Sequence, residues 1–272
     1  MAEAAAPAAT LSGTPRSAYR VLELRTTVIL VAALLALAGI AWWSAIGTSR
    51  GMSMMVMGVA QAGMAMPFDV SAPVFLAMWT VMMAAMMLPT IAPILLMHRL
   101  VVRRRGEGVA PTVAFGAGYL LVWAAVGLVP LAVLIAFRGI ASGAAWVVPV
   151  SGAVLVLAGV YQFTRWKEVC QRACQSPLGF VMTHDFGRGL SGAARTGAVH
   201  GLFCLGCCWA LMAVLFVVGL MNLVWMAGIA AVFLVEKHWR HGLALARVAG
   251  VGLAGLGVAV LVQPAVLAFV VH

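Results

Sequence analysis

Long apolar stretches, separated by short polar segments, run through almost the whole chain. Each stretch approaches or exceeds the roughly 20 residues that a helix needs to cross a bilayer. Because a spanning helix satisfies its own backbone hydrogen bonds, this pattern predicts an all-α, polytopic transmembrane helical bundle of about seven spans, or about six. The expected spans are residues 26–47, 73–97, 113–137, 146–163, 197–218, 220–235 and 246–271.

Three polar or mixed segments are predicted to lie outside the spans. Residues 1–24 begin with an Ala-, Pro- and Ser-rich stretch and are expected to form a disordered cytoplasmic tail, with residues 25–272 as a single transmembrane domain. Residues 48–72 are rich in methionine and are expected as an outer loop. Residues 164–196 contain two cysteines and are expected as an inner loop.

The composition agrees with a membrane protein. Hydrophobic residues make up 64% of the 272 residues and charged residues only 9%, too few for an ordinary soluble domain. A net charge of +10 would suggest nucleic acid in a soluble protein, but here Lys and Arg cluster in the segments between spans. Because such clusters favour the cytoplasmic side, the N-terminus is expected in the cytoplasm. The bilayer is therefore the expected partner, and no nucleic acid is expected.

All five cysteines fall into two groups, one in the inner loop and one in the fifth expected span. The second group is Cys204-Leu-Gly-Cys207-Cys208-Trp209, with Cys204 and Cys208 one helical turn apart. His200 and Met212 extend the same line in the two directions, and Cys207 lies beside it. One helix face thus offers several donors, and two or three thiols can converge on one ion.

The second expected span carries methionines at helical spacing, Met82 and Met86 among them. Thiolates and thioethers are soft ligands that suit Cu(I), with Zn(II) as the alternative where cysteine and histidine dominate. The candidate metal ligands are therefore Cys204, Cys207, Cys208, His200, Met212, Met82 and Met86.

Structural interpretations compete with these assignments. Methionine is a flexible apolar filler, and free cysteine is common in protein interiors. Cys170 and Cys174 are weaker candidate ligands because their C-x-x-x-C spacing is not a usual zinc pattern. Glu236, at the end of an apolar stretch, either forms a structural ion pair with the adjacent Lys237 or has a gating or proton-handling role.

The chain resembles a bacterial family of integral membrane proteins of unknown function that are predicted to bind metal. The resemblance covers about residues 73–240 and has a C-x-G-C-C-W motif as its most specific part. It is carried by Met82-Met-Ala-Ala-Met86-Met-Leu-Pro89, Lys167-Glu-Val-Cys170-Gln-Arg-Ala-Cys174, His200-Gly-Leu-Phe-Cys204-Leu-Gly-Cys207-Cys208-Trp209 and Glu236-Lys237. The resemblance implies a protein of the bacterial inner membrane and a bound metal, but no particular activity.

Three functions follow from these features. The leading hypothesis is a membrane protein that binds a soft metal, copper above all, and transports it, hands it to a metallochaperone or metalloenzyme, or assists metalloenzyme assembly. The second is a thiol–disulfide relay that uses the C-x-x-C of Cys204 and Cys207. The third is a structural subunit of a larger complex. No residue is assigned a catalytic role, and the chain has no nucleotide-binding loop of the kind that a primary pump needs.

Overall fold

Helices are the only regular elements in the described part of the chain. The structure is a computed structural model and describes residues 16–51, 72–136, 146–176, 179–180, 188–219 and 222–267. Within these residues there is no strand, so the predicted all-α architecture is confirmed. The helices are α1 (Arg16–Gly51), α2 (Ala72–Arg104), α3 (Ala110–Val126), α4 (Leu128–Ala136), α5 (Val147–Tyr161), α6 (Arg165–Gln175), α8 (Gly189–Val218), α9 (Leu223–His238) and α10 (Gly242–Val262).

Several of these helices are long and apolar enough to cross a membrane, which makes the chain a multi-pass membrane protein. The described residues contain five candidate spans, or six if α5 and α6, which meet at a 62° bend, form one. Helix α9 occupies the expected span 220–235, but its 16 residues are too short for a hydrocarbon core of roughly 30 Å. The described residues thus hold up to six candidate spans, which agrees with the lower of the two predicted numbers.

The segments between the expected spans are more helical than their polarity suggests. Helix α1 begins at Arg16, within the range expected for a disordered tail. The expected inner loop, residues 164–196, contains all of α6 and the first turns of α8. Residues 1–15 and most of the methionine-rich outer loop, residues 52–71, lie outside the described residues.

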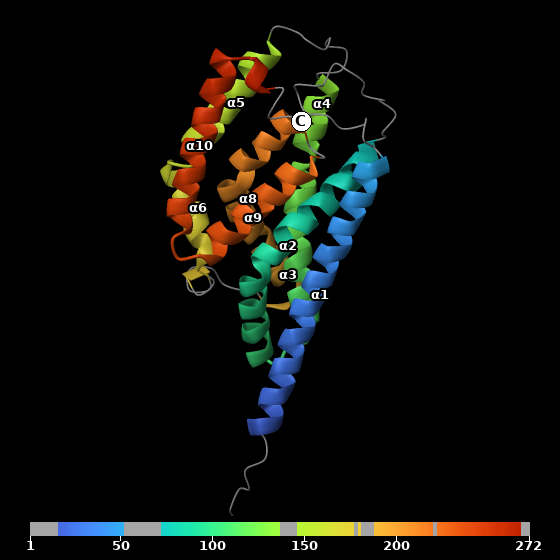
Figure 1. The fold of residues 1–272 in the computed structure, drawn as a ribbon. Coiled ribbons are helices and arrows are strands. Elements are labelled where there is room, and N and C mark those ends of the chain that lie inside the picture. The colour runs from blue at the N-terminus through green and yellow to red at the C-terminus, as the bar shows by residue number, and fades with distance from the viewer. Residues whose placement is uncertain are drawn as a thin grey trace, which may run out of the picture.

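The helices form three neighbouring groups (Figure 1). Helices α1 and α2 lie side by side along one edge, and α5 and α10 lie side by side along the opposite edge. Helices α8 and α9 lie between these pairs, and α3 packs along α8. Helix α8 therefore runs through the centre of the bundle, with its middle part enclosed by its neighbours.

Glycines allow the central helices to touch through their backbones. A Cβ atom on Gly197 of α8 would lie only 2.0 Å from the carbonyl oxygen of Phe115 in α3. A Cβ on Gly118 of α3 would lie equally close to the carbonyl oxygen of Ala194 in α8. This contact, one turn before His200, fixes the depth and rotation of the α8 segment that carries the cysteines.

Helix α2 changes direction along its length, as Figure 1 shows. Pro89 and Pro93 lie inside this helix, where each proline removes a backbone hydrogen bond and crowds the preceding turn. The Thr90 hydroxyl donates to the carbonyl oxygen of Met87 at 2.8 Å, next to this break. The irregular turn thus lies beside the buried side chain of Met87.

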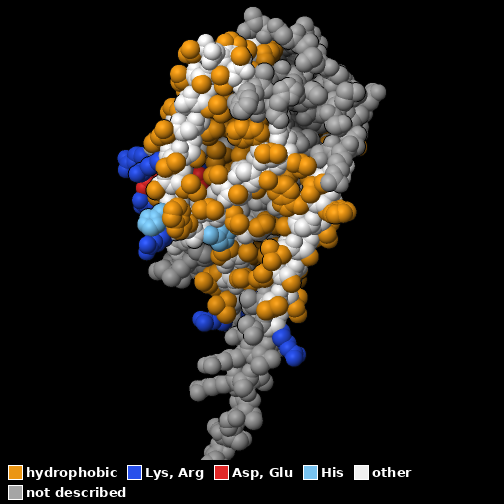
Figure 2. Space-filling model, viewed as in Figure 1, with side chains coloured by type: hydrophobic (Ala, Val, Ile, Leu, Met, Phe, Trp, Pro, Cys, Tyr) orange, Lys and Arg blue, Asp and Glu red, His pale blue; other side chains and the backbone are white. Residues whose placement is uncertain are grey.

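Apolar side chains dominate the visible surface. Figure 2 shows them over most of one face, whereas Lys and Arg gather at its left edge and lower end. Exposed apolar side chains include Val224 at 81%, Val262 at 79% and Leu121 at 69%. A surface of this kind is stable against lipid hydrocarbon and unfavourable in water.

Candidate metal centre

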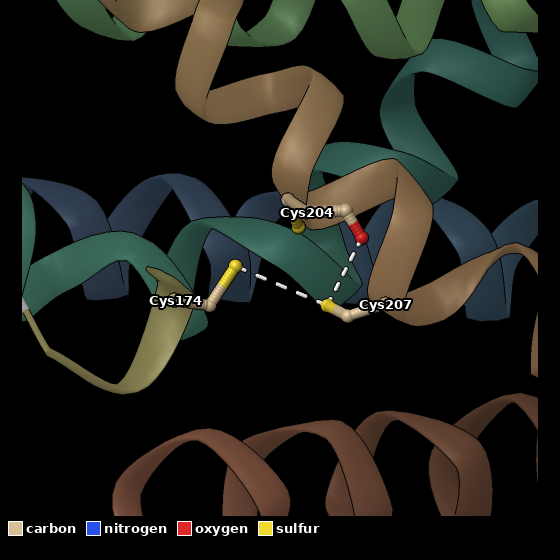
Figure 3. Close-up of side chains that lie close together, drawn as sticks. All are labelled: Cys174, Cys204 and Cys207. Carbon is tan, nitrogen blue, oxygen red and sulfur yellow. Dashed lines mark hydrogen bonds between the residues drawn. The ribbon is translucent and has the colours of Figure 1, made fainter. Parts of the chain in front are cut away.

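Three cysteine sulfur atoms from two helices meet inside the bundle. The Sγ atoms of Cys174 in α6 and of Cys204 and Cys207 in α8 all lie within 4.8 Å of one another. Figure 3 shows Cys174 and Cys207 pointing toward each other from separate helices, with 3.9 Å between their sulfurs. Cys204 and Cys207 are buried, Cys174 is half-buried, and all three are free thiols. We call Cys174, Cys204 and Cys207 the sulfur triad.

One helical turn of α8 sets the positions of its cysteines. The Cys207 thiol donates to the carbonyl oxygen of Cys204 at 3.1 Å, the bond drawn in Figure 3. The sulfur of Cys208 lies 3.3 Å from that of Cys207. The sequence prediction that Cys204, Cys207 and Cys208 cluster therefore agrees with the structure, although Cys208 lies beside the triad and not within it.

Helix α6 is docked by polar side chains on its inner face. Its first turn is capped by the Thr164 hydroxyl, which accepts from the backbone N–H of Lys167 at 3.3 Å. Farther along, the side-chain amides of Gln171 and Gln175 donate to the carbonyl oxygen of Glu236 in α9, at 3.2 and 2.6 Å. The last turn of α6, which carries the third cysteine of the triad, is thus tied to the end of α9.

A buried ion pair lies beneath the triad. The Lys167 ammonium is 2.7 Å from Oε2 of Glu236, and it also donates to the carbonyl oxygen of Cys207 at 2.7 Å. Both charged side chains are at most 2% exposed. The interpretation that Glu236 pairs with its neighbour Lys237 is therefore wrong, because Glu236 pairs with Lys167 across 69 positions of sequence.

Lys237 turns toward the cysteines instead. Its ammonium donates to Sγ of Cys204 at 3.0 Å and to the Thr90 hydroxyl at 3.2 Å, and it lies 3.9 Å from Sδ of Met87. The hydroxyl of Tyr119 lies 3.0 Å from the same Cys204 sulfur. Polar contacts from α9 and α3 thus converge on the sulfur of Cys204.

The methionine that lies beside the triad is Met87, which was not among the predicted ligands. Sδ of Met87 lies 3.9 Å from Sγ of Cys204. Met82 and Met86, the two predicted candidates, are buried in the same helix at 2% and 1% exposure. They are thus part of the hydrophobic core, and the thioether beside Cys204 is supplied by Met87.

The remaining predicted ligands lie along α8 or α6 but outside the triad. His200 is buried among aromatic rings, with ring centroids 5.0 Å from Phe180 and 5.9 Å from Tyr119. Met212 is buried near the far end of α8. Cys170 packs against the bare backbone of Gly206, where a Cβ atom would lie 2.5 Å from its sulfur.

Sequence reasoning missed three residues of this site: Met87, Lys167 and Tyr119. Met87 directly follows the predicted ligand Met86, and Lys167 begins the segment that contains Cys170 and Cys174. Tyr119 lies in an apolar span with no local pattern to mark it. Lys237 was recognised, but with the wrong partner.

A comparison with protein families identifies the chain. The model of a family described as PpoB2, a copper chaperone, matches residues 76–260, which is more than half of the chain. This chain belongs to the PpoB2 copper chaperone family. The matched region of this PpoB2 family member contains all five cysteines, Lys167 and Lys237. No curated protein and no solved structure matches the chain.

Membership of the PpoB2 family agrees with the chemistry of the donors. A copper chaperone carries copper as cargo and requires a protein that receives it. The sulfur triad offers soft donors, the type that copper in its cuprous state prefers. The predicted function, copper binding and handover by a membrane protein, is therefore confirmed at the level of the family.

Proposed function

We propose that this PpoB2 family member binds one Cu(I) ion at the sulfur triad and passes it to a metallochaperone or a copper enzyme. The observation that carries the proposal is the approach of three Sγ atoms to within 4.8 Å of one another, from helices far apart in sequence. Met87, 3.9 Å from Cys204, adds a thioether at the edge of the same site.

The donor set favours Cu(I) over Zn(II). Structural zinc sites are almost always four-coordinate and are built from cysteine, histidine or carboxylate ligands. Among the described residues, only the three sulfurs of the triad come within 4.8 Å of one another, and no fourth cysteine, histidine or carboxylate atom joins that group. Thiolate and thioether donors without a hard fourth ligand are the combination typical of cuprous sites.

Cys174 is the ligand best placed for handover. Cys204 and Cys207 are 0% and 2% exposed, whereas Cys174 is only half-buried and comes from the short helix α6. A thiol of the receiving protein reaches the metal most directly on the side of Cys174. Copper then leaves by exchange of one sulfur ligand for another, with Cys174 released first.

The experiment is a Cu(I) titration of the reduced, detergent-purified protein in competition with a chromophoric Cu(I) chelator. The wild-type chain is expected to bind one Cu(I). Loss of a direct ligand in Cys204→Ser, Cys207→Ser or Cys174→Ser is expected to weaken binding at least about 100-fold, more than typical losses of an outer partner. Cys170→Ser is the matched control: it removes a half-buried thiol from the same helix α6 and should change affinity less than about threefold.

Two other outcomes would overturn the proposal. Reduced wild-type protein that binds no Cu(I) but forms a reversible Cys204–Cys207 disulfide would support the thiol–disulfide relay. Protein whose copper content is unchanged when all five cysteines are replaced by serine would leave only a structural role.

A further inference from the structure

Helix α6 has a second side, which faces away from the bundle. Lys167 and Gln171 are buried on its inner side, where both donate hydrogen bonds to Glu236 in α9. The opposite side carries Trp166, which is 76% exposed although it is the largest apolar side chain of the helix. The exposed residues of this helix form one surface, which we call the outer face of α6: Arg165, Trp166, Val169 and Arg172.

The apolar part of this outer face continues the apolar surface of α5. Leu157 and Val160 of α5 are exposed, and so is Phe163 in the bend between the two helices. Trp166 and Val169 follow at the same three-residue spacing and are exposed as well. Because α5 forms part of a candidate membrane span, the lipid that covers Leu157 and Val160 also reaches the first turns of α6.

Positive charge flanks this apolar strip. Arg165 and Arg172 are exposed on α6 itself, and Arg240 and Arg247 are exposed on the neighbouring turn and on α10. Glu168, the acidic residue of α6, is paired with Arg172. Figure 2 shows Lys and Arg gathered along the left edge, where Figure 1 places α6 and α10. An apolar strip with a net positive charge beside it is complementary to a bilayer surface that carries negative headgroups.

We propose that the outer face of α6 binds anionic phospholipid. Trp166 and Val169 lie at the boundary between headgroups and acyl chains, a depth that indole rings favour. Arg165 and Arg172 reach the phosphate groups of the same lipids, with their aliphatic stems along the apolar strip. An acidic soluble protein would match the charge but not the apolar strip that continues from α5. Since α6 also carries Cys174, the sulfur triad then lies close to the membrane surface.

The experiment measures quenching of Trp166 fluorescence by brominated phospholipids, with the full chain reconstituted into phosphatidylcholine bilayers. The Trp166 signal is the difference in fluorescence between a chain and the same chain with Trp166→Phe. A minor fraction of brominated phosphatidylglycerol or of brominated phosphatidylcholine supplies the quencher. Because each nearby arginine is expected to enrich an anionic lipid about fivefold, phosphatidylglycerol should quench the Trp166 signal at least about twice as strongly as phosphatidylcholine.

Charge variants of α6 test the role of its arginines. Arg165→Gln combined with Arg172→Gln should abolish most of the preference for phosphatidylglycerol, whereas Arg165→Lys combined with Arg172→Lys keeps both charges and should retain it. The matched control is Arg104→Gln combined with Arg105→Gln, which removes two exposed arginines at the end of α2 and should leave the preference unchanged. All four arginines are exposed, so these variants should fold.

Three results would overturn the proposal. Equal quenching by the two lipids in the wild type would show that α6 does not select anionic headgroups. Loss of the preference in the α2 control as well would show that the net charge of the chain attracts the lipid. A Trp166 signal that neither lipid quenches would place the outer face in water and favour an acidic soluble partner. The Cu(I) titration tests the proposed function separately.

Discussion

The α5–α10 pair and the interface of α6, α8 and α9 are both tightly packed, but they achieve this in different ways. Between α5 and α10, glycines let the two backbones approach closely: a Cβ atom on Gly159 would lie 2.6 Å from both the backbone nitrogen of Ala254 and the carbonyl oxygen of Gly250. At the other interface, long polar side chains fill the space, and Lys167 and Glu236 are almost completely buried. The first arrangement needs no charge or hydrogen-bond compensation, whereas the second needs a partner for each ion. The difference indicates which part of the bundle is built for chemistry and which part only holds helices together.

The largest effect is expected from breaking the buried ion pair. Lys167→Met would leave the Glu236 carboxylate without the ammonium that now lies 2.7 Å away, and loss of one partner of such a pair costs about 3–5 kcal/mol. The free energy of unfolding in mixed micelles with increasing denaturing detergent measures this loss. The double variant Lys167→Met with Glu236→Gln removes both charges and should recover at least half of it. A double variant as unstable as the single one would show that the charges are not the cause.

A smaller loss of stability, without loss of copper binding, is expected on the other side of the comparison. Gly159→Ala would place a methyl group against the backbone of α10, and overpacking of this kind costs about 1–3 kcal/mol. The same unfolding assay measures it, and the Cu(I) affinity of the folded fraction should stay unchanged. Gly252→Ala is the control, because a Cβ there has no atom within 4 Å. Equal destabilisation by both variants would mean that the close approach of α5 and α10 does not contribute to stability.

The smallest effect is expected from a single thioether. Met87→Leu keeps the volume of the side chain and should alter stability little, but it removes the sulfur beside Cys204. Cu(I) affinity should fall about threefold to tenfold, equivalent to at most about 1.4 kcal/mol. Met86→Leu, one position earlier in the same helix, should leave affinity unchanged. A larger loss of Cu(I) affinity in Met86→Leu than in Met87→Leu would favour the predicted ligand Met86 over Met87, the methionine beside Cys204.

The sequence was sufficient to predict the fold class and half of the site. Apolar stretches of spanning length leave few alternatives to a helical bundle, and the spacing of Cys204 and Cys207 keeps these residues close on any helix. The position of Cys174 could not be derived in the same way. It depends on the 62° bend before α6 and on how α6 docks against α9, which are tertiary contacts.

The error at Glu236 has a simple geometric cause. Consecutive residues on a helix point in directions about 100° apart, so the side chains of Glu236 and Lys237 do not face each other. Glu236 faces α6 and meets Lys167, and Lys237 faces the cysteines of α8. The adjacency of a carboxylate and an ammonium in sequence therefore indicated two separate contacts and not one ion pair.

The elements of the site are synthesised in a fixed order, which has a consequence for biogenesis. Cys174 in α6 precedes the two cysteines of α8, and Lys237 in α9 follows them. A growing chain therefore lacks a complete site until α9 has been inserted and has docked. A ligand stabilises only the state that binds it. Copper would therefore stabilise chains whose helices have all docked, and it would not bind to incompletely assembled chains.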